Sequence, residues 1–515
     1  MSSTHRKTQA VVRSLLLIGI VVVVNVIAVR VFGRLDLTSQ KVFTLADASR
    51  ELVGSLDDRV TVRAYFTENL PAPHNEKRRA VLDILNEYKA YGGRNFQFEF
   101  INPEGEDGER EAQQQGILPI QAQVIKNDKM EVMRGYLGLV LQYEDRKEVL
   151  PVVQNLANLE YDISSALKRL VNVTKKKIGY SSGHQEPALD RWTQAAQVLQ
   201  GQYELVPVDL TTPEPVPRDL EVLLVIAPVS SMSDSATMKL DRFVMRGGRL
   251  GIFLNTMSAN LQARYAQPSE PVLQGILETY GVRVNADLVR DAQCATINVR
   301  QQQGQFMFSS QVPFPYLPLA SGFSKENLIV KDLGSVVLFF ASSLDTSGAS
   351  ARGVSAEVLV HSSAQSGRQS GFVMIDPFQQ YTAADFPERD IPLAVLLEGS
   401  FQSHTAPPGE KIVSAATRIV VVGDGDFMID EYLGNPGNLS FFANIVDYLA
   451  DDAGLITIRS KNLDTPPLAP VSDGMKPVLK YGNLLLPPVL VIIYGLVRWR
   501  RRLARKKALE LKSGS

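Results

Sequence analysis

Two apolar stretches near the ends of the chain dominate its hydrophobic pattern. They occupy residues 11–32 and 481–499. A membrane helix needs about 20 mostly apolar residues to cross roughly 30 Å of hydrocarbon. The first stretch meets this requirement, because residues 15–29 are broken only by Gly19 and Asn25 and Arg30 can snorkel to the far interface. The second is shorter and depends on its flanking residues. We expect a transmembrane helix at each.

Each stretch has an alternative interpretation. The first has the charge order of a signal peptide, but no small-x-small cleavage site follows before Arg34. The second carries Pro487 and Pro488 near its start, and the alternative is a buried helix. Trp499 followed by arginines is typical of an interfacial belt with a cytoplasmic anchor, so we favour a span. The anchor residues are Trp499, Arg500, Arg501 and Arg502.

Positive charge gathers at the outer ends of both stretches, in residues 5–13 and 498–507. Lys and Arg beside a span tend to stay in the cytoplasm. We therefore expect both termini to be cytoplasmic, at a bacterial inner membrane, with the main body periplasmic or extracytoplasmic and the lipid bilayer as a partner.

Between the stretches, the pattern predicts two α/β domains. In the first domain, Thr44 is expected to cap a helix over 44–56. A β-α-β unit follows, made of a strand at 60–66, a helical pattern near 81–88 and a strand at 96–101. Strands at 137–143 and 148–152 close it, and the polar run 104–115 is a solvated loop or helix.

The second domain alternates strands with helices and short turns. Strands are expected from 177, at 204–209, 222–227, 249–254, 371–375 and from 418, with helices at 192–200, 235–246 and 439–450. The strand at 222–227 is apolar on both faces, as a central parallel strand should be. The fold class is therefore α/β with a doubly wound parallel sheet.

The expected organisation follows the chain in order. It comprises a cytoplasmic tail at 1–10, a span at 11–32, the first domain at 33–153, a linking helix at 154–175, the second domain at 176–458 with a β-rich insertion at about 295–370, a juxtamembrane linker at 459–480, a span at 481–499 and a basic tail at 500–515.

The composition of the chain excludes several classes of function and several kinds of site. The 515 residues carry a formal net charge of -1, which argues against a nucleic-acid binder. The single cysteine, Cys294, allows no intrachain disulfide and no metal site with two cysteines, and it lacks a nearby base, so we interpret it as a packing residue. No P-loop or Gly-x-Ser-x-Gly elbow is present, and no cofactor is expected.

Polar residues follow two of the predicted strands. Gly183, His184 and Glu186 follow one, and Asp424 and Asp426 follow another. Ligands of an open parallel sheet gather beyond the carboxyl ends of its strands, so these are the candidate residues for binding a ligand or partner. Structural roles in turns and helix caps remain the alternative, and no catalytic or metal role is assigned.

Several segments together resemble GldG-like proteins, the gliding-motility-type auxiliary subunits of ABC transporters. They are Arg34-Leu-Asp-Leu-Thr with Thr44-Leu45, Lys177-Ile-Gly-Tyr-Ser-Ser-Gly-His-Gln-Glu186, Phe243-Val-Met-Arg-Gly-Gly-Arg249, Ile419-Val-Val-Val-Gly-Asp-Gly-Asp-Phe427 and the arginine-rich end after Asn483. The resemblance covers almost the whole chain. One departure is Gln185, where the family often has Gly.

The resemblance implies a non-catalytic membrane subunit that works with a separate ABC permease and ABC ATPase and binds a substrate or envelope component. It also implies a thioredoxin-like first domain and a second domain similar to class I glutamine amidotransferases. Neither carries the expected chemistry, because the first lacks a Cys-x-x-Cys pair and Pro228-Val-Ser-Ser follows the central strand of the second. Folds persist without their chemistry.

Two alternatives remain open. One is a membrane-tethered, metal-dependent hydrolase using His184, Glu186, Asp424 and Asp426, which requires these side chains to converge within about 2.0 to 2.6 Å of one ion. The other is a stand-alone extracytoplasmic binding module, with no associated permease.

Overall fold

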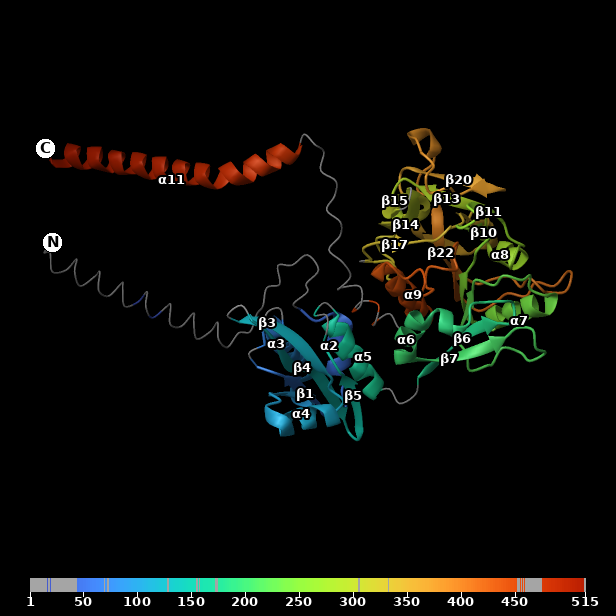
Figure 1. Ribbon diagram of the computed structural model, residues 1–515, viewed down its shortest axis with the longest axis horizontal. Coiled ribbons are helices and arrows are strands. Elements are labelled where there is room, and N and C mark those ends of the chain that lie inside the picture. The colour runs from blue at the N-terminus through green and yellow to red at the C-terminus, as the bar shows by residue number, and fades with distance from the viewer. Residues whose placement is uncertain are drawn as a thin grey trace. The chain divides into compact units, whose positions relative to one another are not determined.

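A computed structural model describes most of the chain (Figure 1). It covers Leu16, Gly19, residues 44–451 except 69, 72–73, 127–128, 154–155, 157, 172–174, 304–305 and 332, then 454, 456, 458 and 475–513. The chain forms two compact units, residues 1–464 and 465–515. The first unit contains two sheet-based cores.

The first core surrounds a five-stranded sheet. Its elements are α2 (Asp47–Gly54), β1 (Val60–Phe66), α3 (His74–Gly92), β2 (Phe96–Ile101), α4 (Gly105–Gln114), β3 (Pro119–Lys126), β4 (Lys129–Tyr143), β5 (Arg146–Leu150) and α5 (Leu159–Val171). β1 pairs in parallel with β2 and antiparallel with β4, and β4 also pairs antiparallel with β3 and β5. The predicted β-α-β unit and its two closing strands are therefore present, and the polar run is the helix α4.

Helices cover both faces of this sheet. Val81, Leu85 and Tyr88 recur along α3 at helical spacing and pack with α2, α5 and one face of β1. Ala112 of α4 packs with Tyr65 on the other face. The segment expected to link two domains, α5, buries its apolar stripe in this first core, so it belongs to the first domain.

The expected helix cap at Thr44 is wrong. α2 begins at Asp47, and Ala46 occupies the N-cap position. The backbone N–H of Ala46 donates to Oε1 of Glu160 at 2.5 Å, and Glu160 is itself buried. A carboxylate distant in sequence therefore satisfies this donor, which the local cap pattern did not reveal.

The second core surrounds an eight-stranded sheet with the order β16-β19-β22-β23-β9-β8-β6-β7. β7, β6, β8, β9 and β23 are mutually parallel, and β22, β19 and β16 continue the sheet antiparallel. The elements in this sheet are β6 (Lys176–Ser182), β7 (Tyr203–Asp209), β8 (Val222–Ile226), β9 (Arg249–Phe253), β16 (Gly322–Phe323), β19 (Ser355–His361), β22 (Pro392–Gly399) and β23 (Thr417–Val422).

Helices pack on both faces of the parallel part. α6 (Thr193–Gln202) and α9 (Pro436–Leu449) contribute to the core on one face. α7 (Asp234–Met245) and α8 (Gln274–Tyr280) contribute to the core on the other. All five residues of β8 are buried, because helices cover this strand on both sides. The predicted doubly wound arrangement of strands and helices is present in this sheet.

The rest of this core consists of short strands in small sheets. They are β10 (Met257–Asn260), β11 (Tyr265–Pro268), β12 (Arg283–Val284), β13 (Asp287–Asp291), β14 (Cys294–Gln303), β15 (Phe306–Ala320), β17 (Val336–Val337), β18 (Leu344–Asp345), β20 (Ser366–Ser370) and β21 (Val373–Met374). Two expectations need correction. The strand predicted at 371–375 pairs with β11 outside the main sheet. β19, inside the expected insertion, pairs with β22 and joins the main sheet.

The second compact unit contains α11 (Met475–Ser513). Within the part of the chain that the structure describes, no helix is long and apolar enough to cross a membrane. The span expected at 481–499 coincides with α11 and is not supported. Its apolar run is interrupted by Pro487 and Pro488 and ends at Arg498. The span expected at 11–32 lies outside the described residues, apart from Leu16 and Gly19.

A buried carboxylate, Asp241 on α7, ties three segments together. It accepts hydrogen bonds from Tyr280 Oη at 2.8 Å and Ser403 Oγ at 2.6 Å, from the backbone N–H of His404, and from both N and Oγ1 of Thr405. Burial alone would raise the pKa of this carboxyl, but the donors outweigh burial and hold it below its ordinary value.

Asp241→Ala is expected to lower the free energy of unfolding by about 3 kcal/mol or more, because several buried donors lose their acceptor. Since the folded-state pKa is depressed, the stabilisation by Asp241 is present above its unfolded pKa and is lost as the pH falls through the folded pKa. Urea denaturation of wild type and variant between neutral and acidic pH measures both effects. Asp234→Asn, an exposed change on the same helix, is the control; an equal loss there would contradict this role.

Candidate functional site

The turn after β6 holds three of the predicted site residues. Gly183 has a φ of +102°, and a Cβ at this position would lie 2.7 Å from Asp209 Oδ1. Glycine is therefore required here both for its backbone conformation and for space. Gln185, two residues later, also has a positive φ, +63°. The turn is tight and its conformation is costly for a residue with a side chain.

Glu186 fixes this turn from inside. Its carboxylate accepts from Ser181 Oγ at 2.8 Å and from the backbone N–H of His184 at 2.6 Å. The carbonyl of His184 in turn accepts from the backbone N–H groups of Val229 and Ser230, at 3.0 and 3.2 Å. The turn after β6 is thereby joined to the turn after β8.

The side chains of His184 and Glu186 point into the protein. They are only 6% and 2% exposed, and His184 Nδ1 lies 3.9 Å from Glu186 Oε1. His184 Nδ1 has no hydrogen-bond partner among the described residues. A Ser-His-acid triad needs the histidine between the hydroxyl and the carboxylate. Here the carboxylate bonds directly to Ser181, so these three residues do not form that arrangement.

Asp424 is fully buried in the turn after β23. It accepts from the backbone N–H of Phe339 at 2.6 Å and of Asp426 at 2.7 Å. Burial raises the pKa of Asp424 well above its ordinary value, the charge of Asp426 raises it further, and the backbone donors act in the opposite direction. Burial also raises the pKa of Asp426, against a lowering interaction with the Asn255 side chain. Asp424 organises the turn rather than facing solvent.

A pocket of about 340 Å³ lies where four parallel strands end. Its lining comes from the segments that follow β6, β8, β9 and β23, namely Gln185, Pro187, Arg191, Ala227, Val229, Asn255, Asp426 and Ile429. β6 lies between β7 and β8, and the helices α6 and α7 that follow β6 and β8 belong to cores on opposite faces. This is the topological switch point, where open α/β sheets bind ligands.

One of the predicted site residues lines this pocket, and the others lie in the turns that surround it. Asp426 lines the pocket, whereas Gly183, His184, Glu186 and Asp424 shape the turns around it. The sequence analysis did not identify Arg191 or Asn255. Asn255 could have been predicted, because it directly follows the strand expected at 249–254, whose carboxyl end lies at the same edge of the parallel sheet. Its Oδ1 accepts from the backbone N–H of Gly425 at 2.7 Å, which joins the ends of β9 and β23.

The groups that line the pocket are suited to binding. A guanidinium, a carboxyl and two amides offer hydrogen-bond donors and acceptors to a polar ligand. Ala227, which follows the central strand β8, has a φ of +42°. A strained residue at such a strand end often marks a functional site, but the methyl group of Ala227 supplies no nucleophile. Within the described residues, no group of three or more His, Cys, Asp or Glu could hold a metal ion.

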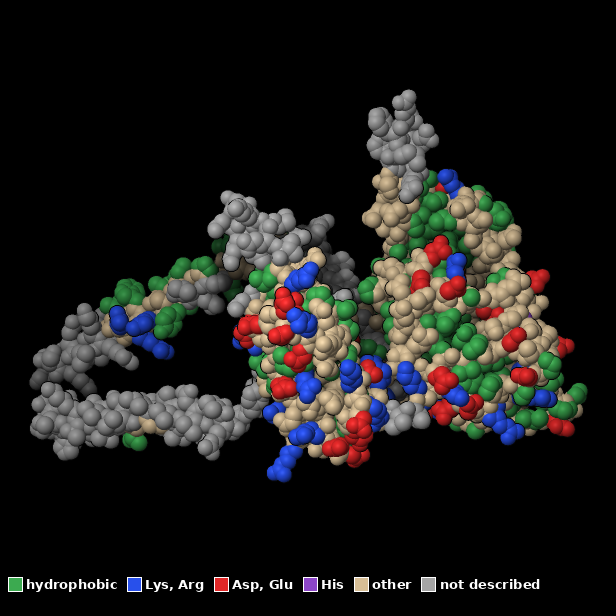
Figure 2. All heavy atoms as spheres, turned by 60° about the horizontal axis from the view of Figure 1, so that its bottom comes forward, with side chains coloured by type: hydrophobic (Ala, Val, Ile, Leu, Met, Phe, Trp, Pro, Cys, Tyr) green, Lys and Arg blue, Asp and Glu red, His purple; other side chains and the backbone are tan. Residues whose placement is uncertain are grey.

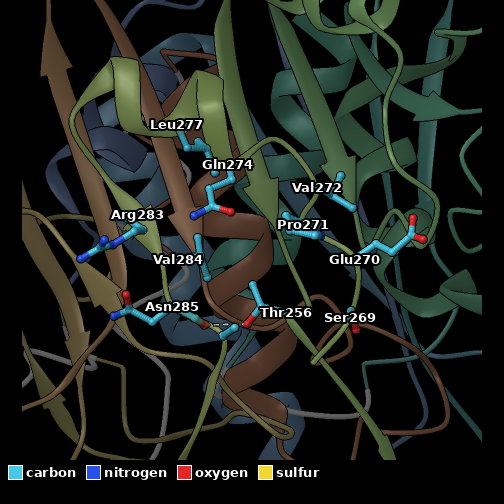
Figure 3. Close-up of a pocket in the computed structure, with 11 residues that line it drawn as sticks. Thr256, Ser269, Glu270, Pro271, Val272, Gln274, Leu277, Arg283, Val284 and Asn285 are labelled. Atoms are coloured by element: carbon cyan, nitrogen blue, oxygen red, sulfur yellow. Dashed lines mark hydrogen bonds between the residues drawn. The ribbon is translucent and has the colours of Figure 1, made fainter. Parts of the chain in front are cut away.

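A second cavity, of about 250 Å³, lies beside α8 (Figure 3). In this view the charged ends of Glu270 and Arg283 lie toward opposite sides of the cavity. Thr256 Oγ1 donates to the Asn285 carbonyl at 2.7 Å. Asn255 and Thr256 are consecutive, so one connection after β9 contributes to both cavities. No sequence motif had indicated this second cavity.

The charges on the surface are mixed. In the face seen in Figure 2, Lys and Arg side chains are interspersed with Asp and Glu over the described surface. This agrees with the net charge of -1. Local clusters therefore matter more for recognition than a long-range field of one sign.

Gly425→Ala is expected to destabilise the pocket end of β23. Its Cβ would lie 2.6 Å from Ala227 Cβ and 3.1 Å from the Phe253 carbonyl, so the switch-point backbone must move, at a cost of about 1 to 3 kcal/mol. Gly434→Ala, where nothing lies within 4 Å of the added Cβ, is the matched control. Thermal unfolding of both variants tests this close approach, and equal melting temperatures would refute it.

Comparisons with known proteins identify relatives of the chain. Residues 39–142 match a domain of unknown function, DUF7088. A curated protein of Borreliella burgdorferi, described as an uncharacterized protein, is 23% identical over 499 residues, which are 92% of this chain and 94% of the relative.

Solved structures give weaker similarity. The mmIFT52 N-terminal domain is 13% identical with a TM-score of 0.33, over 53% of this chain and 97% of that one. A ThuA-like protein from Parabacteroides merdae is 9% identical with a TM-score of 0.27, over 54% of this chain and 91% of that one.

The second domain gives the decisive match. Residues 175–452, more than half of the chain, match the family described as an ABC-type uncharacterized transport system. This range includes both turns of the switch-point pocket. The chain belongs to this family of auxiliary components of ABC transport systems.

Proposed function

We propose that the chain is a non-catalytic auxiliary subunit of an envelope ABC transporter, and that its switch-point pocket binds a substrate or a segment of a partner. Family membership supports the auxiliary role. The observation that carries the binding role is the strained Ala227 in a formed pocket of about 340 Å³. The site keeps the geometry of a ligand pocket but places a methyl group where a reaction would need a nucleophile.

The partners in this proposal are a separate permease and a separate ATPase. Motion of the permease during ATP hydrolysis would reposition the two domains or change access to the pocket.

We further propose the narrower GldG-like assignment, with a thioredoxin-like first domain and a second domain similar to class I glutamine amidotransferases. The parallel β1–β2 pair followed by the antiparallel β4 and β5 supports the first of these domain assignments.

Membrane anchoring and an extracytoplasmic location are also part of the proposal. They rest on the apolar stretch at 11–32 and on the positive residues at its outer end, since the span expected at 481–499 is not supported. If the chain is anchored, it stays in the membrane pellet after an alkaline carbonate wash, and release into the supernatant would contradict anchoring.

The subunit hypothesis predicts a stable complex. Tagged protein, extracted from its native cells in mild detergent and captured, should bring down an ABC permease and an ABC ATPase in near-stoichiometric amounts, as read by mass spectrometry.

An Arg191→Ala/Asp426→Asn variant tests the pocket separately. It should retain the complex if the pocket binds a substrate and lose it if the pocket binds the permease.

Recovery of the chain without either partner, under conditions where another ABC complex of the same cells stays assembled, would contradict the proposal. It would favour a stand-alone binding module instead.

A further inference from the structure

A third cavity, of about 580 Å³, lies between α7 and the loop that follows β7. This volume is in the range of small-molecule sites. Four basic side chains line it, Arg218 from the loop, Lys239 and Arg242 from α7, and Arg246 at the C-cap of that helix. The three on the helix recur at spacings of three and four residues, so they share one face. No acidic residue lines this cavity among the described residues.

Two of the cations are held in place by the loop. Lys239 Nζ donates to the carbonyls of Leu210, at 3.0 Å, and of Thr212. Arg246 Nη1 donates to the Val216 carbonyl at 3.0 Å, and its guanidinium lies 5.0 Å from the centre of the Phe243 ring. The carbonyl groups that fix their positions are neutral, and the nearby carboxylates interact with them only electrostatically, Asp209 with Lys239 and Asp219 with Arg246.

The other two cations, Arg218 and Arg242, are exposed. Neither side chain makes a hydrogen bond or an ion pair with another described residue. Asp219, the acidic group near Arg246, is paired with Lys177 at 2.8 Å. Burial lowers the pKa of Arg246, and the positive charge of Arg218 lowers it further, which agrees with repulsion between these cations.

Apart from Ser235, the remaining walls are apolar, and they are partly rigid. Pro213, Pro215 and Val216 line the loop side, and proline fixes its own φ near −65°. Met238 contributes from the helix. A cavity with clustered guanidinium groups and an apolar wall fits a compact group of multiple negative charge that is attached to a less polar body.

We infer that this cavity binds a phosphate-bearing ligand, with Arg218 and Arg242 contacting phosphate oxygens and Lys239 and Arg246 supplying fixed positive charge. Guanidinium groups match phosphate because they donate two parallel hydrogen bonds to its oxygens. The site is separate from the switch-point pocket, and the inference does not depend on assembly with a transporter. The phosphate would come from a soluble phosphate compound or from a lipid headgroup.

The test compares two charge-matched variants of the full chain. Arg218→Gln/Arg242→Gln removes the two exposed cations of the cavity whose side chains have no partner among the described residues. Arg79→Gln/Arg389→Gln removes the same charge from exposed positions outside it. Calorimetry with inorganic pyrophosphate is one arm, and flotation with vesicles with and without phosphatidylglycerol is the other. Circular dichroism melting checks that both variants fold like wild type.

The expected result is that the cavity variant binds at least about tenfold more weakly than wild type in one arm, while the control variant binds like wild type. Loss in the pyrophosphate arm identifies a soluble phosphate compound, and loss only with anionic vesicles identifies a lipid headgroup. The inference is overturned if neither probe binds, or if the control variant loses as much affinity as the cavity variant. Binding that weakens with added salt is expected in either arm.

Discussion

The switch-point site depends on one buried carboxylate, that of Glu186. It accepts the Ser181 hydroxyl and the His184 N–H, which closes the turn after β6. That turn then presents the His184 carbonyl to two N–H groups of the turn after β8. Because a buried, unpaired donor or acceptor costs about 1 to 3 kcal/mol, these bonds hold both turns in register. The pocket lies where these two turns meet the segments that follow β9 and β23.

The same edge of the sheet is tied together at a second place. Asn255 after β9 accepts from Gly425, and Asp424 bonds within its own turn and to Phe339. Four strand ends are thus connected through short polar contacts. A pocket built on such rigid ends needs little reorganisation to bind a ligand, which favours recognition. The methyl group of Ala227 in its lining is consistent with a family of auxiliary transport components.

Much of this fold could be predicted from local patterns. The fully apolar run at β8 correctly predicted a central parallel strand. Ligands of open parallel sheets gather beyond the carboxyl ends of the strands, and this rule correctly predicted that Asp426 lines the pocket. The direction of the Glu186 side chain could not be predicted, because it depends on the left-handed Gly183 and on Ser181. The N-terminus of α2 was missed for a similar reason, since its partner lies 114 residues away. The apolar strand β22 had a readable signal that the sequence analysis did not use.

In our proposal this chain modulates a transporter without doing chemistry itself. The most direct measurement is ATP hydrolysis by the purified permease and ATPase, before and after stoichiometric addition of this chain. We predict that the chain alone hydrolyses no ATP and that its addition changes the rate of the assembled system. An unchanged rate with the chain demonstrably bound, or hydrolysis by the chain alone, would contradict the account.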